Sequence, residues 1–402
     1  MRVMAPRRFL ATLIASSLFL ALLCACGVIP SPFERPPPPT PVAPPPPPTT
    51  AIAFPPIPGL PSGLPTGFPS GLPTSFPTTI PGLPTTLPSP GASLLSTDPP
   101  PDYATLAPAP SGSTDGHGAM TMAFLRTEVT SVIEEVRQHL PPAHLARVAN
   151  VPFHIVDDTN EPNAAAGCAP GNGAPMIMIT QPMLTICAAT AEARAYDELA
   201  HTTTYETYAS SIMDMFRHGG VRGLAPDALS GPLATDPRKL ARQRHLFDEE
   251  VAFILGHEMA HHYRGHTGCA PGGAASAAQA EDLERSLAQA APPLEQPFEI
   301  EADMWGITSV LEAGHERAGG HWSDEGALLS LDTFRHLGET NTDDLPMVFL
   351  STHPPSMLRA PIVEQVARAW TPGRAPLPEP TIDSQGISID LGGGSPIHIP
   401  IP

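Results

Sequence analysis

The chain has 402 residues, of which 55 are proline, and 29 of these prolines lie between residues 30 and 110. Because proline fixes φ and lacks the amide donor, this stretch is excluded from helices, from sheets and from a packed core. The formal net charge of -19, with Lys239 as the single lysine, excludes the clustered basic surface of a nucleic-acid-binding protein, so we expect no nucleic acid among the partners.

Residues 1–25 have the pattern of a signal peptide. Three arginines precede an apolar run from Phe9 to Leu23, which has the length of a signal-peptide core and is short for a membrane span. The run ends in Leu-Cys-Ala-Cys-Gly at residues 23–27, which resembles a bacterial lipobox and predicts lipidation of Cys26. An ordinary cleaved signal peptide that contains two cysteines is the alternative.

This pattern predicts a lipid anchor to a membrane of the cell envelope. Gly27 is not the acidic residue that some bacteria use for retention at the inner membrane, so the periplasmic face of the outer membrane is preferred. Secretion and the inner membrane are the alternatives. Composition divides the rest of the chain into a disordered proline-rich linker at 26–114, a folded domain at 115–371 and a disordered tail at 372–402.

The folded part has the pattern of an α+β fold that is mainly helical with a small β-sheet. Apolar runs predict strands at 151–156 and 176–180, and a strand or turn at 184–187. Helical periodicity with proline and glycine boundaries predicts helices at 119–140, 191–216, 242–264, 298–313, 324–336 and 356–370. A low-complexity insertion at 270–291 is expected to hold a short exposed helix near 281–289.

Three cysteines lie in the folded part, at positions 168, 187 and 269. In an oxidising periplasm one disulfide and one free thiol are expected, and the short separation favours a bond between Cys168 and Cys187. None of the three lies in a Cys-x-x-Cys pair, so a zinc site built from cysteines is disfavoured.

Residues 257–261 form an H-E-x-x-H motif on a predicted helix. Residues four apart share one helical face, so His257 and His261 can direct their imidazoles at one metal ion. Glu258 lies beside that face, within reach of a water molecule at the metal. Apolar residues just before the motif indicate a buried helix, where such polar side chains would be costly without a partner.

A metal site of this kind needs a third ligand. In the longer motif H-E-x-x-H-x-x-G-x-x-H the third histidine would fall at Thr267 and the glycine at Arg264, so that class is excluded. Glu299 and Asp303 instead share a face of a later helix, so Glu299 can bind the metal while Asp303 orients a ligand histidine. Glu301 is the rival ligand, but it has no aspartate four residues later.

Four further residues lie near these motifs. Ala302 and Gly306 are small enough to let the second helix approach the first closely. His262 and His266 are interpreted as structural or surface histidines.

Together, the two motifs resemble those of a zinc peptidase family that includes the HtpX-type membrane proteases, the CAAX prenyl proteases and several bacterial periplasmic lipoproteins. The family pattern of H-E-x-x-H followed by E-x-x-A-D is met here by residues 257–261 and 299–303. The resemblance implies a zincin-like metallopeptidase domain with a single Zn²⁺ held by His257, His261 and Glu299.

The resemblance also implies an activity. Glu258 would take the proton of a zinc-activated water and pass it to the leaving amine, which makes the protein a zinc metalloendopeptidase. Its substrates would be proteins or peptides, such as misfolded envelope proteins. In this fold type an edge strand pairs with the extended substrate, and we expect that strand at 174–180.

The resemblance extends to Ser351-Thr352-His353-Pro354 and to Arg359, and more loosely to residues 163–165. It implies that His353 or Arg359 is catalytic, as a donor to the oxyanion of the tetrahedral intermediate. The alternatives are a capped loop histidine for His353 and a structural ion pair for Arg359.

One competing function belongs to another class. The protein would then be a zinc-containing but proteolytically latent lipoprotein with a binding or chaperone-like role, its site covered by the insertion at 270–291. An intramembrane prenyl protease is disfavoured, because the chain has no second apolar run of about 20 residues.

Overall fold

The structure is a computed structural model, and it describes residues 93–96, 99–157, 159–225, 228–229, 231–270, 275–287, 296–317, 319–340, 356–373, 381–383, 386–390 and 397–400. The expected signal peptide, the expected lipidation site Cys26, most of the expected linker and His353 lie outside the described residues.

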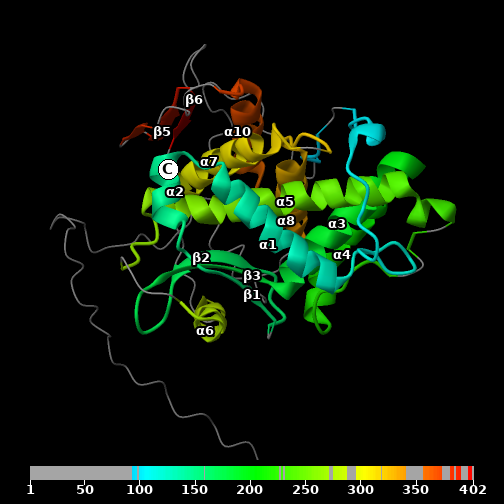
Figure 1. Cartoon of the computed structure of the whole chain (residues 1–402), viewed down its shortest axis with the longest axis horizontal. Coiled ribbons are helices and arrows are strands. Elements are labelled where there is room, and N and C mark those ends of the chain that lie inside the picture. Colours follow the sequence, from blue (N-terminus) through cyan, green and yellow to red (C-terminus); the bar gives the residue numbers. More distant parts are fainter. Residues whose placement is uncertain are drawn as a thin grey trace, which may run out of the picture. The chain divides into compact units, whose positions relative to one another are not determined.

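The described part is mostly helical with a small three-stranded sheet, which confirms the expected α+β class (Figure 1). The helices are η1 (Tyr103–Thr105), α1 (Met122–Gln138), α2 (Pro142–Val148), α3 (Gln181–Ala200), α4 (Thr204–Arg217), η2 (Pro232–Thr235), α5 (Pro237–Arg264), α6 (Ala277–Leu287), α7 (Gln296–Gly314), α8 (Glu325–Thr340) and α10 (Ser356–Ala369). The strands are β1 (Phe153–Val156), β2 (Ala164–Cys168), β3 (Pro175–Thr180), β4 (Thr381–Asp383), β5 (Gly386–Ile389) and β6 (Ile397–Pro400).

Helix α5 is the central element of the fold. It packs against α7, α3, α8 and α1, and almost all of its residues are buried (Figure 1). The charged side chains in its first half are paired, so Lys239 Nζ lies 2.5 Å from a Glu192 oxygen and Arg242 Nε lies 2.9 Å from a Glu198 oxygen. Pairing is the condition under which such groups are found in a protein interior.

Local capping sets the ends of α5. The helix begins at Pro237, earlier than residue 242, because the Asp236 side chain accepts a hydrogen bond from Arg238 N at 2.8 Å. It ends where the sequence predicts, at Gly265, which has a φ of 85°.

The expected strand or turn at 184–187 is wrong, because these residues lie inside α3. The Thr180 side chain accepts a hydrogen bond from Met183 N at 3.4 Å and thereby caps a helix that begins directly after β3. The single helix expected at 191–216 is divided at His201, which has a φ of 55°. Asp197 then accepts hydrogen bonds from the first amides of α4.

The main sheet has the strand order β1-β3-β2, with β1 parallel and β2 antiparallel to β3. The segment expected to form a substrate-binding edge strand, 174–180, is therefore the central strand, and that expectation is wrong. β2 is the edge strand next to α5. Its pairing with β3 places Ala166 opposite Ile177.

The two faces of this sheet pack against different layers (Figure 1). Ile177 and Ile179 face the main helical core, whereas Met176 and Met178 face a smaller cluster that includes Leu283 of α6. This division follows from the alternation of side chains along a strand. The insertion that carries α6 therefore forms a second cover for the sheet.

Helices α5 and α7 meet at two glycines, which confirms the close approach expected at Gly306. A Cβ atom added at Gly256 would lie 3.2 Å from Gly306 O, and one added at Gly306 would lie 3.0 Å from His257 N. Both neighbours are backbone atoms that cannot rotate away. The crossing therefore favours glycine at residue 306 and at residue 256, directly before the H-E-x-x-H motif.

The described fold differs from the expected boundaries at both ends. Leu94 is 5% exposed within the core, and its amide donates to Asp332 Oδ1 at 2.8 Å, so ordered contacts begin well before residue 115. β4, β5 and β6 form an antiparallel sheet where the sequence predicts a disordered tail, with β5 in the middle. Ile389 of β5 is buried in the main core.

Within the part of the chain that is described, no helix combines the length and the apolar character needed to cross a membrane.

The glycine crossing yields a stability prediction. We expect Gly306→Ala to lower the free energy of unfolding by about 1–3 kcal/mol, because the added methyl group forces two backbones apart. Gly338→Ala in helix α8 is the control, since nothing lies within 4 Å of a Cβ added at Gly338. This variant should keep or raise the stability, because alanine is more favourable than glycine in a helix by about 1 kcal/mol. Denaturant titration measures both, and equal stability of Gly306→Ala and the wild type would contradict the prediction.

Candidate metal centre

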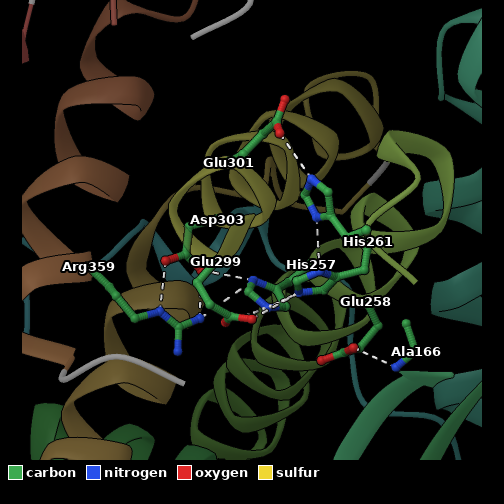
Figure 2. Close-up of polar contacts among 9 residues, drawn as sticks. Ala166, His257, Glu258, His261, Glu299, Glu301, Asp303 and Arg359 are labelled. Atoms are coloured by element: carbon green, nitrogen blue, oxygen red, sulfur yellow. Dashed lines mark hydrogen bonds and ion pairs between the residues drawn. The ribbon is translucent and has the colours of Figure 1, made fainter. Parts of the chain in front are cut away.

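Three buried side chains from two helices converge on one point (Figure 2). His257 and His261 lie one turn apart on α5, with their Nε2 atoms 3.0 Å from each other. Glu299 of α7 completes the group, with one carboxylate oxygen 3.4 Å from His257 Nε2 and the other 3.3 Å from His261 Nε2. These residues are the three that the sequence predicts as ligands, and the group can hold a metal ion.

The spacing of these atoms fits a small tetrahedral ion. Ligand atoms about 2.0–2.1 Å from such an ion lie about 3.3 Å from one another. The three separations of 3.0, 3.3 and 3.4 Å are close to this value. Nitrogen and carboxylate oxygen are also the donor types found at zinc and related divalent metals.

The protonation of the two histidines reflects the carboxylates around them. Burial lowers the pKa of His261 to about 3, so its imidazole is in the neutral form that binds metals. Burial also opposes a charge on His257, but hydrogen bonds with Asp303 and Glu299 raise its pKa to about 10. The surrounding carboxylates therefore favour a protonated, positively charged His257 in the metal-free centre. A bound cation would take the place of the proton on this imidazole.

Asp303 holds the ring of His257. Its Oδ1 lies 2.9 Å from His257 Nδ1, which leaves Nε2 directed at Glu299. Arg359 of α10 donates to both oxygens of Asp303, from Nε at 2.7 Å and from Nη2 at 2.6 Å. Although burial opposes the charge, Arg359 and the hydrogen bond from His257 hold the pKa of Asp303 below its usual value.

This geometry favours one of two interpretations of Arg359. The sequence offers it as a donor to the substrate oxyanion or as an ion-pair residue. In the structure its guanidinium lies beside Asp303 and donates to both carboxylate oxygens, and its Nη2 is 3.5 Å from His257 Nδ1 (Figure 2). Arg359 is thus a positioning residue in this arrangement. His353, the other expected donor, lies outside the described residues.

Glu258 faces the edge strand. It is 3% exposed, and its Oε2 accepts a hydrogen bond from Ala166 N of β2 at 2.7 Å (Figure 2). Burial raises the pKa of Glu258 to about 7, the nearby positive charge of His257 opposes that rise, and the negative charge of Glu299 adds to it. A carboxyl group with such a pKa can both take and release a proton near neutral pH.

Sequence reasoning missed two partners of the centre. His266 lies against His261, and Glu301 lies against His266 rather than against the expected ligands. Gly265 carries the signal that could have located His266, because a glycine that ends a helix folds the next residue back over the last turn. His262 is structural as expected, since its Nε2 lies 2.7 Å from Met176 O of β3.

A second group of possible ligands is an ion-pair network. Glu206, Asp332 and His336 have atoms close enough to share a metal. However, Arg335 Nη2 lies 2.9 Å from His336 Nε2 and 2.9 Å from Asp332 Oδ1. A guanidinium at that position opposes a second cation by charge repulsion.

The disulfide pairing differs from the expected one. Cys168 is bonded to Cys269, across a sequence separation of 101, and Cys187 is a buried free thiol in α3. The expected pairing of Cys168 with Cys187 is wrong because residue 187 lies inside a helix rather than in a neighbouring strand. The bond joins the end of β2 to the segment that follows α5.

Helix α6 packs against the sheet, mainly at β1, from the face opposite the main helical core, and Leu283 also reaches β2. An added Cβ at Gly167 would lie 2.6 Å from Leu283 Cδ2. Asn163, which belongs to the weakly matching segment before the strand, donates from Nδ2 to Glu284 Oε2 at 2.9 Å. Burial raises the pKa of Glu284 to about 7, the Asn163 amide opposes that rise, and Glu161 adds to it.

Comparison of the chain with protein-family models, with curated proteins and with solved structures finds no match in any of the three.

The disulfide yields a stability prediction. We expect the double variant Cys168→Ser, Cys269→Ser to lose about 2–4 kcal/mol in the free energy of unfolding, because the bond restricts a long loop of the unfolded chain. Denaturant titration measures the loss, and the wild type with reductant should show the same one. Peptide mapping that recovers Cys168 joined to Cys187 would contradict the pairing.

Glu284 yields a pH prediction. Its pKa of about 7 in the folded protein lies above the ordinary value of 4.5, so the folded state binds the proton more tightly. Its contribution to stability is complete below pH 4.5 and is lost as the pH rises through 7. Relative to the wild type, Glu284→Gln should therefore gain about 1–3 kcal/mol between pH 4.5 and pH 8.

Chemical denaturation across this pH range tests the prediction. Glu281→Gln, on an exposed position of the same helix, is the matched control and should show no such gain. A stability difference between Glu284→Gln and the wild type that does not change with pH would contradict the assignment.

Proposed function

We propose that the protein is a zinc-dependent endopeptidase of the bacterial cell envelope, with Glu258 as its general base. The observation that supports this most is the convergence of His257, His261 and Glu299, with Glu258 placed between that group and the edge strand β2. This arrangement is the one that the resemblance to the HtpX-type and CAAX prenyl proteases implies. It brings three candidate metal ligands, a base and a strand edge into one small region.

Zinc is the metal that we propose for the centre. Two histidines and one glutamate form a three-ligand set, which leaves a fourth position for water or substrate. Zinc, when bound, lowers the pKa of a water molecule and polarises a carbonyl group. Asp303 and Arg359 keep the ring of His257 aligned for that role.

Glu258 would move the proton. Its pKa of about 7 allows it to accept a proton from the attacking water and to return that proton to the leaving amine. The amide of Ala166 holds one carboxylate oxygen at 2.7 Å and so fixes the direction of the group. The second carboxylate oxygen is the one available for the proton transfer.

The edge of β2 would align the substrate. Because Ala166 N donates to Glu258 rather than to β3, the amide points away from the sheet, along the edge that faces the metal centre. Among the described residues no strand pairs with this edge. An extended peptide could add there as a further strand, and the small side chains of β2 leave space for its backbone.

The envelope location rests on the sequence. A lipid on Cys26 would attach the domain to a membrane, and the proline-rich linker would separate it from that membrane. Protein or peptide substrates in the envelope are the partners that this placement favours.

A proteolytically latent binding or chaperone-like lipoprotein is the alternative, in which the centre would bind zinc without turning over a substrate. The described part of the insertion, α6, packs on the opposite face of the sheet, where Leu283 contacts β2 at Gly167, so α6 itself does not cover the centre.

A single variant tests the proposed chemistry. Glu258→Gln should reduce kcat/KM for an unstructured protein or peptide substrate by at least about 10²-fold, because the proton acceptor is lost while the ligands remain. Zinc content, measured by mass spectrometry of the metal, should stay that of the wild type. A chelator should abolish the wild-type activity.

Glu250→Gln is the matched control on the same helix. Burial raises the pKa of Glu250 well above its usual value, so the neutral amide is a close substitute, and activity should not change. Equal activity of Glu258→Gln and the wild type would overturn the proposal. Zinc binding without any turnover by the wild type would favour the latent alternative.

A further inference from the structure

The end of helix α5 places His266 against the metal centre. Gly265 N donates to His262 O at 3.1 Å, and His266 N donates to His261 O at 2.8 Å. Gly265 lies in the left-handed region, and together these two bonds form a Schellman motif. In this motif the second residue after the helix, here His266, donates its amide to a carbonyl of the last turn and packs its side chain on the residue that owns that carbonyl. The contacted residue is the ligand His261.

The side chain of His266 is enclosed on three sides. Its Nδ1 lies 3.0 Å from His261 Nδ1, and its Nε2 lies 3.0 Å from Glu301 Oε2. Its ring stacks on Phe298, with centroids 4.5 Å apart. The side chain is only 4% exposed, so water does not compete for these contacts.

The positions of the protons in this hydrogen-bonded series of side chains follow from the role of His261. A histidine that binds a metal through Nε2 carries its proton on Nδ1, and that proton can be donated only to an acceptor. His266 Nδ1 is the atom in reach, so it accepts, and the proton of His266 must then lie on Nε2. Glu301 Oε2 accepts that second hydrogen bond.

Glu301 is itself anchored. Arg264 Nε donates to Glu301 Oε1 at 2.7 Å, so both carboxylate oxygens are engaged. The hydrogen-bonded series therefore runs from the Glu301 carboxylate through His266 to the ligand His261, and each bond in it has one donor and one acceptor.

We propose that His266 and Glu301 are positioning residues of the metal centre, which fix the tautomer and the ring plane of His261. This inference rests on the metal centre that the proposed function requires, and it concerns how that centre is held rather than what it hydrolyses. Asp303 does directly for His257 what Glu301 does for His261 through an intervening imidazole. Helix α7 thus supplies one ligand and the anchoring carboxylates of both histidines.

Metal binding by the full chain tests this assignment. His266→Phe removes both hydrogen bonds and keeps a ring that can stack on Phe298. We expect it to weaken zinc affinity, measured by competition with a chelating dye, by about 10–100-fold. The visible absorption of the Co²⁺-loaded chain should also change, because the ligand ring is no longer held in one plane.

Conservative variants separate positioning from loss of packing. His266→Gln keeps a donor and an acceptor, and Glu301→Gln keeps an acceptor, so both should retain more affinity than His266→Phe and Glu301→Leu. The midpoint of thermal unfolding of the metal-free chain should stay close to that of the wild type in these variants, while the zinc affinity falls. His144→Phe is the matched control, because His144 stacks on Tyr263 near the same helix end at 4.2 Å. Its zinc affinity should equal that of the wild type.

Two results would overturn the inference: wild-type affinity with an unchanged Co²⁺ spectrum in His266→Phe, or the same loss of affinity in His144→Phe. The outcome is independent of peptidase activity. A chain that binds zinc through a His266-dependent site but hydrolyses nothing would refute the proposed function and leave the positioning role intact.

Discussion

The close crossing of α5 and α7 is the constraint on which the candidate centre depends. Gly256 and Gly306 let the two backbones touch, with His257 N only 3.0 Å from the position of an added Cβ. Glu299 lies about two turns before this crossing, and its carboxylate therefore reaches the imidazoles of the neighbouring helix. Larger side chains at the crossing would move the two helices apart, and the third ligand would lose its place.

The same crossing buries an excess of negative charge. Glu258, Glu299 and Asp303 are all buried around the histidines, and Arg359 is the one buried guanidinium among them. When the three carboxylates are ionised they outnumber the guanidinium by two, and in the metal-free centre a proton on His257, whose pKa is about 10, compensates part of this excess. Uncompensated charge in a protein interior costs several kcal/mol, so the set favours a bound divalent cation.

Sequence reasoning succeeds here where one helix fixes the geometry by itself. The four-residue spacing of His257 and His261, and that of Glu299 and Asp303, places each pair on a common face without knowledge of the fold. The order of the strands could not be obtained in this way, because the position of β2 at the edge depends on pairing between distant segments. The disulfide was misassigned for the same reason. Cys187 is closer than Cys269 to Cys168 in sequence, but the fold brings Cys269, 101 residues away, next to Cys168.

Tertiary contacts also changed the interpretation of Arg359, whereas a local rule would have located His266. Arg359 reaches Asp303 from α10, a helix more than 50 residues further on, and nothing in its own segment indicates that partner. His266 follows a helix-ending glycine, and the Schellman geometry alone sets it over His261. The two ligand rings are thus held by different kinds of interaction. One depends on the packing of three helices, and the other depends mainly on how a single helix ends.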